Sequence, residues 1–380
     1  GKAVTAVGSA LKSVTTSAVN AGMSFENAMS SVAAISGAAG TDFEKLSKKA
    51  EQMGASTKYT ATEAADAMQY MAMAGWKTED MLSGIDGIMN LAAASGSDLA
   101  QTSDIVTDAL TAFGKQAKDS GEFADVLAAA SANANTNVDL MGETFKYVGS
   151  VAGAMGYSIQ DIALATGLMA NSSIKGSTAG TALRATITRM AKPTEESSMA
   201  MSALGLSLTD ANGNMKSFGE IMKDMRKGMQ GMTEDEKASY AAMLGGQEAM
   251  SGLLAIANAS DEDFNKLSDA INNAAGSAEK MADIKMDNLQ GDVTKLQSSL
   301  EGLGITAFQQ VNDNFRGFVQ NIKNAVDELN QKLSDGKYIE KAIQWVEKLG
   351  SAFKDGGLEG GLKEIGDLLD GTGDKVKTFG

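Results

Sequence analysis

The residues that could carry chemistry in this 380-residue chain are carboxylates, hydroxyls, lysines and tyrosines, because the sequence contains no His and no Cys. A thiolate nucleophile, a Ser-His-Asp triad and an ordinary structural zinc site each require one of these missing side chains. Paired carboxylates could hydrolyse glycosidic bonds, and the candidates are Glu195-Glu196 and Glu234-Asp235-Glu236. Both follow a threonine at an expected helix start, where the helix dipole favours acidic residues. We therefore predict no catalytic residue.

Two acidic, glycine-containing segments suggest a cation-binding loop, but neither meets the requirements of one. Counting from Asp210, the sixth position is Met215 where a calcium loop needs Gly, and the twelfth is Ile221 where a bidentate Glu belongs. An Asn-Gly turn explains this segment better, and residues 370–374 are interpreted as an ordinary loop. The sequence also lacks the G-x-x-x-x-G-K-[ST] phosphate loop, so we expect no metal and no cofactor.

The composition favours helices. One Pro and 42 Gly occur in the chain, against roughly 5% and 7% in average proteins, so helices are rarely interrupted by Pro and glycines can end them. Only 5% of residues are aromatic whereas 23 are Met, which predicts an adaptable core of small and soft side chains. The formal net charge of -15 argues against specific nucleic-acid binding, since such a surface needs clustered Lys and Arg.

No segment of the sequence qualifies as a membrane-spanning helix. The longest uncharged stretches, 27–41 and 147–160, are shorter than the roughly 18 apolar residues needed and are diluted with polar residues. The chain opens at Gly1 with neither an initiator Met nor a signal peptide, which suggests a processed product or part of a longer chain.

Residues 1–36 have the periodicity of a coiled coil. Apolar residues from Val4 to Ile35 alternate steps of three and four for about five heptads, which is an a/d seam on one face of a helix. The seam could bind another chain or pack on its own domain, because several seam positions are Ala and charged flanking positions are lacking. The self-association residues predicted in this helix are Val4, Val7, Leu11, Val14, Phe25, Val32 and Ile35.

Residues 37–259 are predicted to form a compact domain of about ten short helices, because helix start and stop signals alternate along them. Hydroxyl and carboxylate residues have capping-box spacing at four expected starts: Thr41 with Glu44, Thr60 with Glu63, Ser158 with Asp161, and Thr233 with Glu236. Glycines such as Gly75, Gly114 and Gly156 lie where helices should stop. Residues 206–218 differ, since alternating flanks around an Asn-Gly turn predict a small β-hairpin.

A long helix with a second seam is predicted over residues 260–335, followed by short helices over 336–380. Its seam steps by three and four from Leu289 and contains a stutter near 307–315. Leu289, Leu296 and Leu303 are the self-association residues predicted here. The fold class is therefore all-α: a compact multi-helix domain with one small β-hairpin, flanked by coiled-coil-like helices.

Several segments, taken in order, resemble one known family. They include residues 24–36, 59–68, Ala154-Met-Gly-Tyr-Ser158 and the glycine-containing run Ser173-Ile-Lys-Gly-Ser-Thr-Ala-Gly-Thr-Ala-Leu-Arg184, with Pro193 following. Over residues 20–260 the sequence resembles the core region of phage tail tape measure proteins, including those of related phage-tail-like bacteriocins.

The resemblance implies a structural protein of the virion tail, not an enzyme. Such a protein is assembled in the host cytoplasm, sets tail tube length, occupies the tube lumen or distal tip, and is released on infection to help the genome cross the host envelope. The implied partners are further copies of the chain, three in all, together with tube, hub or baseplate proteins, tail assembly chaperones and the host cell envelope. Two other classes remain open: a secreted helical membrane-active protein and a tail-associated cell-wall hydrolase.

Overall fold

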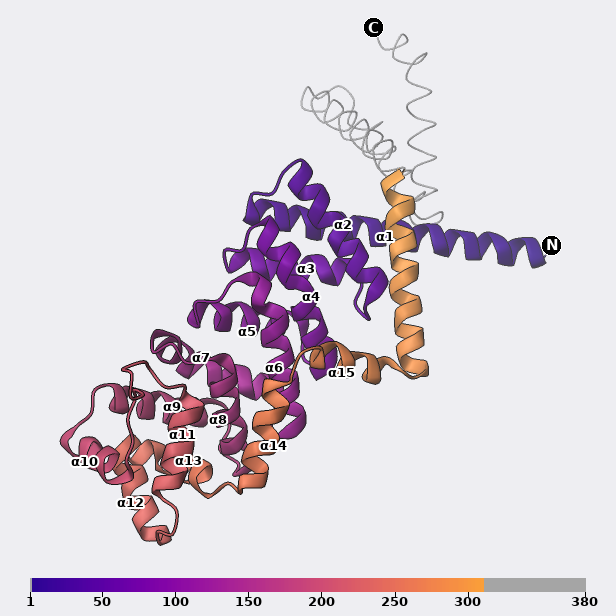
Figure 1. Ribbon diagram of the computed structural model, residues 1–380. Helices are drawn as coiled ribbons and strands as arrows, with labels where there is room; N and C mark the ends of the chain where they lie inside the picture. The colour runs from indigo at the N-terminus through magenta and orange to yellow at the C-terminus, as the bar shows by residue number, and fades with distance from the viewer. Residues whose placement is uncertain (1, 311–380) are drawn as a thin grey trace, which may run out of the picture. The chain divides into compact units, whose positions relative to one another are not determined.

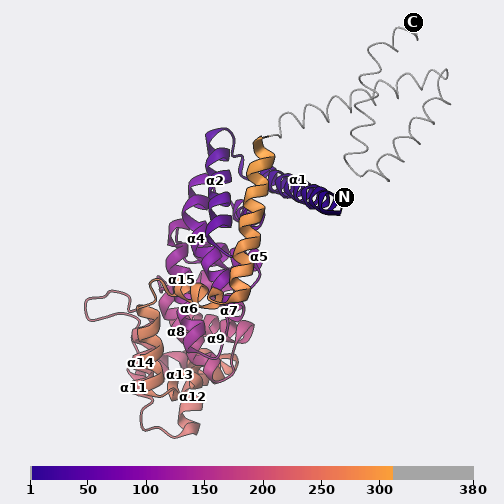
Figure 2. The ribbon, with the colours of Figure 1, turned by 90° about the vertical axis from the view of Figure 1, so that its right-hand side faces the viewer.

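The computed structural model describes residues 2–310, with side chains from residue 19 onward, and this part of the chain is almost entirely helical (Figures 1 and 2). A last helix covers residues 289–310 and carries no label in Figure 1. The labelled helices are α1 (Lys2–Ser36), α2 (Thr41–Ser56), α3 (Ala61–Met73), α4 (Thr78–Ser95), α5 (Leu99–Ala112), the 3-10 helix η1 (Ala117–Asp119), α6 (Ser120–Asn133), α7 (Val138–Ala154), α8 (Ile159–Asn171), α9 (Gly176–Ala191), α10 (Glu195–Leu204), α11 (Phe218–Gly228), α12 (Glu234–Gly245), α13 (Gln247–Asn258), α14 (Asp261–Asn272) and α15 (Ser277–Met286).

Four consecutive helix pairs, α2–α3, α4–α5, α6–α7 and α8–α9, stack in two layers. The second helices form one layer, in which α3, α5, α7 and α9 pack on one another in chain order and α1 covers α3. The first helices form the other layer, in the order α2, α4, α6, α8. A two-layer stack in which each pair contacts its neighbours is the arrangement of an α-solenoid.

The pairs are joined by the same helix-ending structure. Gly75, Gly114 and Gly156 have φ values of 90°, 64° and 73°, a left-handed conformation that favours glycine. In each case the next residue donates its N–H to a carbonyl five residues back, for example Trp76 to Met71 at 3.0 Å, which is a Schellman motif. These glycines recur about every 40 residues, the repeat length of helix-pair solenoids.

The second helix of three pairs begins with a side-chain cap. Thr60, Asp98 and Asn137 each accept a hydrogen bond from the backbone N–H three residues later, at 3.1, 3.0 and 2.8 Å. A cap of this kind pairs one of the four N–H groups that a helix start leaves without partners. The repeated architecture is therefore encoded by a repeated pair of signals, one stop and one start.

Glycines allow the stacked helices to approach closely. A Cβ at Gly180 of α9 would lie 2.6 Å from the Thr144 carbonyl oxygen of α7. At Gly153 of α7, a Cβ would collide with the Ala112 carbonyl oxygen at the end of α5. Larger side chains at these positions would force neighbouring pairs apart.

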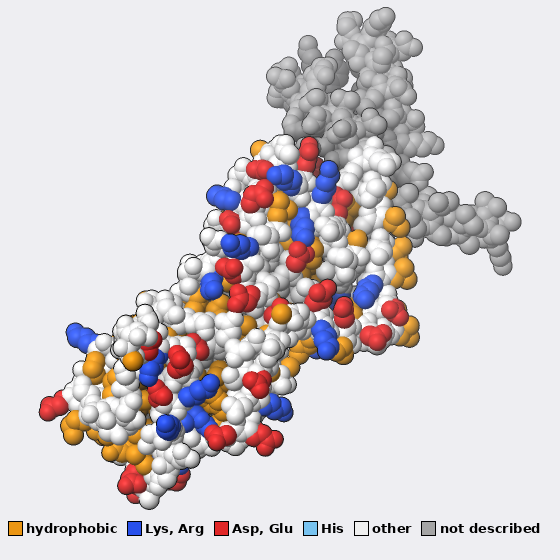
Figure 3. All heavy atoms as spheres, in the orientation of Figure 1, with side chains coloured by type: hydrophobic (Ala, Val, Ile, Leu, Met, Phe, Trp, Pro, Cys, Tyr) orange, Lys and Arg blue, Asp and Glu red, His pale blue; other side chains and the backbone are white. Residues whose placement is uncertain are grey.

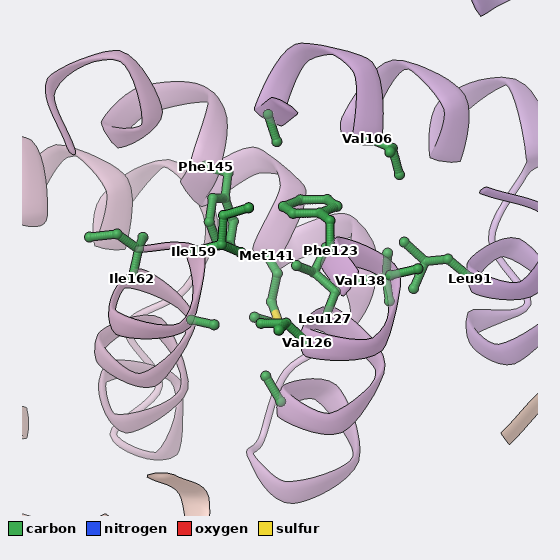
Figure 4. Close-up of a cluster of buried hydrophobic side chains, with 14 of the residues drawn as sticks. Leu91, Val106, Phe123, Val126, Leu127, Val138, Met141, Phe145, Ile159 and Ile162 are labelled. Carbon is green, nitrogen blue, oxygen red and sulfur yellow. The ribbon is translucent and has the colours of Figure 1, made fainter. Parts of the chain in front are cut away.

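The core between the layers is filled mainly by Ala, Met and branched aliphatic side chains. Aromatic rings occur at the α5–α6–α7 contact, where Phe123 and Phe145 meet edge to face with centroids 5.6 Å apart (Figure 4). Phe145 also lies 5.7 Å from the ring of Phe113. Both Phe123 and Phe145 are fully buried, so this pair lies at the centre of the stack.

Residues 261–305, which we call the return segment, run back along the first-helix layer. Helix α14 packs on α8 and α6, α15 packs on α6 and α4, and the final helix is bonded to the α2–α3 turn and to α3. The Asp125 carboxylate of α6 accepts hydrogen bonds from the backbone N–H groups of Gly276 (2.7 Å) and Ala278 (2.9 Å), so it caps α15. Lys285 donates to the Ser95 carbonyl at 3.0 Å.

The predicted β-hairpin at 206–218 is wrong. The described residues contain no sheet there, only one isolated antiparallel bridge between Thr209 and Met215. The backbone N–H groups of Lys216 and Asp210 donate to the carbonyls of Leu208 and Asn214, both at 2.8 Å, and two such bonds close a turn without forming the ladder of two strands. The Asp210 side chain also stabilises this turn, because its carboxylate accepts hydrogen bonds from the backbone N–H groups of Asn212 and Asn214 at 2.8 and 2.9 Å.

The chain forms three helices between residues 260 and 310, where the sequence predicted one long helix. Asn273 ends α14, and the left-handed Gly276, with φ 76°, precedes α15. A second break falls at Asp287 and Asn288, before the helix that begins at residue 289. Because α15 is capped by Asp125 of another helix, the first break is fixed by a tertiary contact. Most of the predicted stutter at 307–315, and all of 336–380, lie outside the described residues.

Substituting Gly153 with Ala should destabilise the fold by about 1–3 kcal/mol, because the added methyl group overpacks the α5–α7 contact. The matched control is Gly121→Ala, at a helical glycine whose Cβ would meet nothing within 4 Å. The control should be neutral or stabilising by up to about 1 kcal/mol, since Ala is the better helix former. Urea unfolding of both variants measures the difference, and equal effects would contradict the proposed close approach.

Candidate interaction surface

The helix at 289–305 has two opposite faces of unlike character. Its inward face carries Gly291, Ser298 and Ile305, all buried. Its outward face carries five apolar side chains that step by four and three residues and are exposed to solvent: Leu289 78%, Val293 40%, Leu296 59%, Leu300 57% and Leu303 68%. We call these five residues the leucine face. Figure 3 shows hydrophobic side chains along the outer edge of this helix.

The contacts of the inward face explain why the helix is oriented this way. The Ser298 hydroxyl, 3% exposed as a residue, lies 3.1 Å from the Lys58 carbonyl oxygen, to which it donates. Thr62 donates its hydroxyl to the Glu301 carboxylate at 2.7 Å. A surface helix normally buries its apolar face and exposes its polar one. This helix buries Ser298 and Ile305 but leaves five apolar side chains exposed, and a contiguous exposed apolar patch is typical of an interaction site.

The surroundings of Lys58, next to the inward face, disfavour its positive charge. Burial lowers the pKa of Lys58 below its usual value, and the positive charge of Lys285 lowers it further. The nearby Glu63 opposes this change. The Lys58 ammonium lies 4.8 Å from the centre of the Tyr59 ring, a cation–π contact that partly compensates for its burial.

The second half of α1 packs inside the chain. Among the α1 side chains that the structure describes, Phe25 is 3% exposed and Val32 is fully buried, in the core that α1 forms with α3. Ile35 is 41% exposed. Phe25 and Val32 of the predicted seam are therefore buried within their own chain, whereas Ile35 is exposed to solvent.

The first half of α1 extends past its partner (Figure 1). Helix α1 has 35 residues and α3 has 13, so at 1.5 Å per residue they are about 52 and 20 Å long. Helix α3 can therefore cover only part of α1, and the described buried residues of α1 all fall at Gly22 or later. Val4, Val7, Leu11 and Val14 belong to the extending half, where the helix but not the side chains is described.

The paired carboxylates lie in the first turns of two helices, and Glu236 caps the start of α12. The carboxylate of Glu236 accepts from the Thr233 backbone N–H at 2.8 Å, and the backbone N–H of Glu236 donates to the Thr233 hydroxyl at 3.3 Å. Glu234 accepts from Lys237 and Asn258, and these hydrogen bonds lower its pKa. Glu195 and Glu196 lie in the first turn of α10. All five carboxylates therefore lie in first helical turns, as the sequence predicted.

A polar hollow of about 390 Å³ lies between α8 and the start of α11, lined in part by Ser158, Gln160 and Lys216. Its one carboxylate, Asp161, accepts hydrogen bonds from the backbone N–H groups of Phe218 (3.2 Å) and Gly219 (3.0 Å). Asp161 therefore caps α11, a tertiary cap that sequence spacing alone did not reveal. Within the described residues, no group of three His, Cys, Asp or Glu side chains is placed to hold a metal ion.

None of the helices in residues 2–310 is both long and apolar enough to cross a membrane.

Comparison with known proteins identifies the class of protein to which this helical stack belongs. Residues 47–246, which span the helix pairs, match the family model described as phage-related minor tail protein. The tape measure protein of Pneumococcus phage Dp-1 is 36% identical over 317 residues, which are 81% of this chain and 28% of that protein. No solved structure matches the chain.

Two further relatives extend the similarity. The probable tape measure protein of Escherichia phage P2 is 27% identical and covers 86% of this chain. That of Clostridium phage phiCD119 is 24% identical and covers 96%. The chain belongs to the phage tail tape measure protein family. It spans between 28% and 39% of the length of these relatives.

In an ordinary amphipathic helix, an apolar-to-polar substitution lowers the free energy of unfolding more than a polar-to-apolar one. We expect the reverse order for Leu296 and Ser298. Ser298→Leu should destabilise the protein by about 1–3 kcal/mol, because it overpacks the inward face and removes the bond to Lys58. The matched change Leu296→Ser should alter stability by less than about 0.5 kcal/mol, since Leu296 is exposed. Urea unfolding at low protein concentration measures both. A larger cost for Leu296→Ser would show that the leucine face is packed within the chain.

Proposed function

We propose that this chain is the core of a structural tail protein that sets tail tube length during assembly. It occupies the tube lumen or distal tip and is released on infection to help the genome cross the host envelope. The observation that carries the proposal is the similarity to tape measure proteins, which in the relatives described above extends over 81% to 96% of the chain.

The proposed partners are further copies of the chain, three in all, and the tail tube, hub or baseplate proteins. Tail assembly chaperones and the host envelope are the other proposed contacts. The exposed leucine face supports association between copies, because apolar residues at a/d spacing are the usual contact between helices of different chains. We also propose domain boundaries at residues 36, 259 and 335, which separate the helical core domain from the coiled-coil-like segments on either side of it.

We propose no enzymatic role. The relatives are named as tape measure proteins, and the carboxylates that could have acted on glycosidic bonds are hydrogen-bonded as helix caps or lie in a first helical turn. A net charge of -15 also suits a protein that shares a compartment with DNA without adhering to it.

The length-setting role can be tested in the phage that encodes the full-length protein. Deleting residues 319–332, two heptads of the predicted coiled coil, should shorten the tail by about 21 Å, because a helix rises 1.5 Å per residue. Electron microscopy of purified tails measures the change. As a matched control, replacing the same residues with two unrelated heptads should leave tail length unchanged. Tails of unaltered length after the deletion would exclude a length-setting role for these residues.

A further inference from the structure

The loop between α10 and α11 carries the one Asn-Gly dipeptide of the chain, Asn212-Gly213, at an exposed turn. Asn-Gly deamidates more readily than other dipeptides, because glycine has no side chain to keep its backbone nitrogen away from the asparagine amide. We propose that Asn212 is the residue at which this chain deamidates, and that the Asp210 carboxylate sets the rate by holding the turn closed.

The reaction would replace the Asn212 amide by a carboxylate in two steps. The Gly213 backbone N–H gives its proton to hydroxide, and the nitrogen attacks the side-chain carbonyl carbon of Asn212. This new C–N bond closes a succinimide ring, while the bond from the same carbon to the side-chain nitrogen breaks, and ammonia leaves after taking a proton from water. Water then adds to one of the two ring carbonyls and opens the ring, which leaves aspartate or isoaspartate at position 212.

The turn keeps the two reacting atoms apart. The Gly213 N–H donates to the Asp210 carbonyl oxygen at 3.1 Å, a bond between the first and fourth residues of a β-turn. Neither Ala211 nor Asn212 has a positive φ, so the turn is type I, whose third residue has a ψ of about 0°. At that ψ the Gly213 nitrogen eclipses the Asn212 backbone nitrogen and lies about 120° around the Cα–C bond from Cβ. Ring closure needs this nitrogen beside Cβ, so the turn must open first.

The Asp210 carboxylate is the side chain that holds the turn. It accepts hydrogen bonds from the backbone N–H groups of Asn212 (2.8 Å) and Asn214 (2.9 Å) and from the Asn214 side-chain amide (3.2 Å). The bonds from the backbone and side chain of Asn214 lower the pKa of Asp210, so the carboxylate is ionised at neutral pH and these bonds are charge-assisted. Packing adds little, since residues 209–215 are all exposed and a Cβ at Gly213 would meet no atom within 4 Å.

Peptide mass spectrometry of the full 380-residue chain, kept at mildly alkaline pH, tests the inference. Asn212 in the folded chain should convert about tenfold more slowly than in guanidinium chloride, because the reaction waits for local opening. Asp210→Ala should convert Asn212 severalfold faster than the folded wild type does. Asp210→Asn keeps an oxygen acceptor and should recover most of the protection.

Two controls separate local opening from loss of charge or of the fold. Asp235→Ala removes the same charge from an exposed first helical turn and should leave the conversion of Asn212 unchanged. Asn171, whose side-chain oxygen accepts from the Asn135 N–H at 2.8 Å, should stay unconverted in Asp210→Ala. Faster conversion of Asn171 would mean that this variant unfolds globally, and Asp210→Asn compared with the wild type would then decide.

Three results would overturn the inference. The first is equal conversion of Asn212 in the folded and unfolded chains, which would show that the turn gives no protection. The second is equal conversion in Asp210→Ala and the folded wild type, which would show that Asp210 does not set the rate. The third is an asparagine other than Asn212 converting first in the unfolded chain.

Discussion

The close approach of helix backbones is the constraint on which the rest of this structure depends. The second helices of successive pairs meet through glycines and alanines, with Gly149 and Gly153 of α7 against Ala112 and with Gly180 of α9 against Thr144. In the other layer, Gly87 of α4 lies against the first turn of α6, and its Cβ would be 2.7 Å from the Gly121 nitrogen. The sparse use of aromatic side chains follows from this geometry, because thin interfaces leave little room for rings.

The return segment compensates for a weakness of stacked pairs. In a solenoid each pair contacts only its neighbours, so stability is distributed locally. Helix α14 contacts both α6 and α8, α15 contacts both α4 and α6, and the final helix is bonded to the α2–α3 turn. Helices α14 and α15 therefore each join two successive pairs from outside, and the final helix is bonded to the first pair. The cap that Asp125 gives α15 fixes this segment in register along the layer.

Local signals in the sequence predicted much of the helical structure. They failed where contacts between distant residues determine the structure. Thr60 and Thr233 form the predicted capping boxes, and Gly96 and Gly205 end helices in the left-handed conformation. Thr41 instead lies inside α2, which begins after Gly40 without a side-chain cap. Gly54 does not end a helix but lies within α2, where it allows close contact with Ala61.

The candidate surface illustrates the same limit. The spacing of Leu289, Leu296 and Leu303 revealed an apolar stripe, but spacing alone does not tell which stripe a chain buries within itself. Phe25 and Val32 have the same periodicity and are buried. The solenoid was missed although its signal was present, since Gly75, Gly114 and Gly156 recur at nearly constant intervals.

The course of the return segment also determines how this body would affect the extension of a longer polypeptide. The chain enters the stack along α1, which packs on α3, and comes back to the α2–α3 turn near residue 301. Its points of arrival and departure are therefore neighbours, as in a domain inserted into a host protein. The helices between these two points would therefore add almost nothing to the end-to-end distance of an extended polypeptide. A domain folded in this way lies beside the path of the longer polypeptide. The length of that path is set by the segments outside the domain.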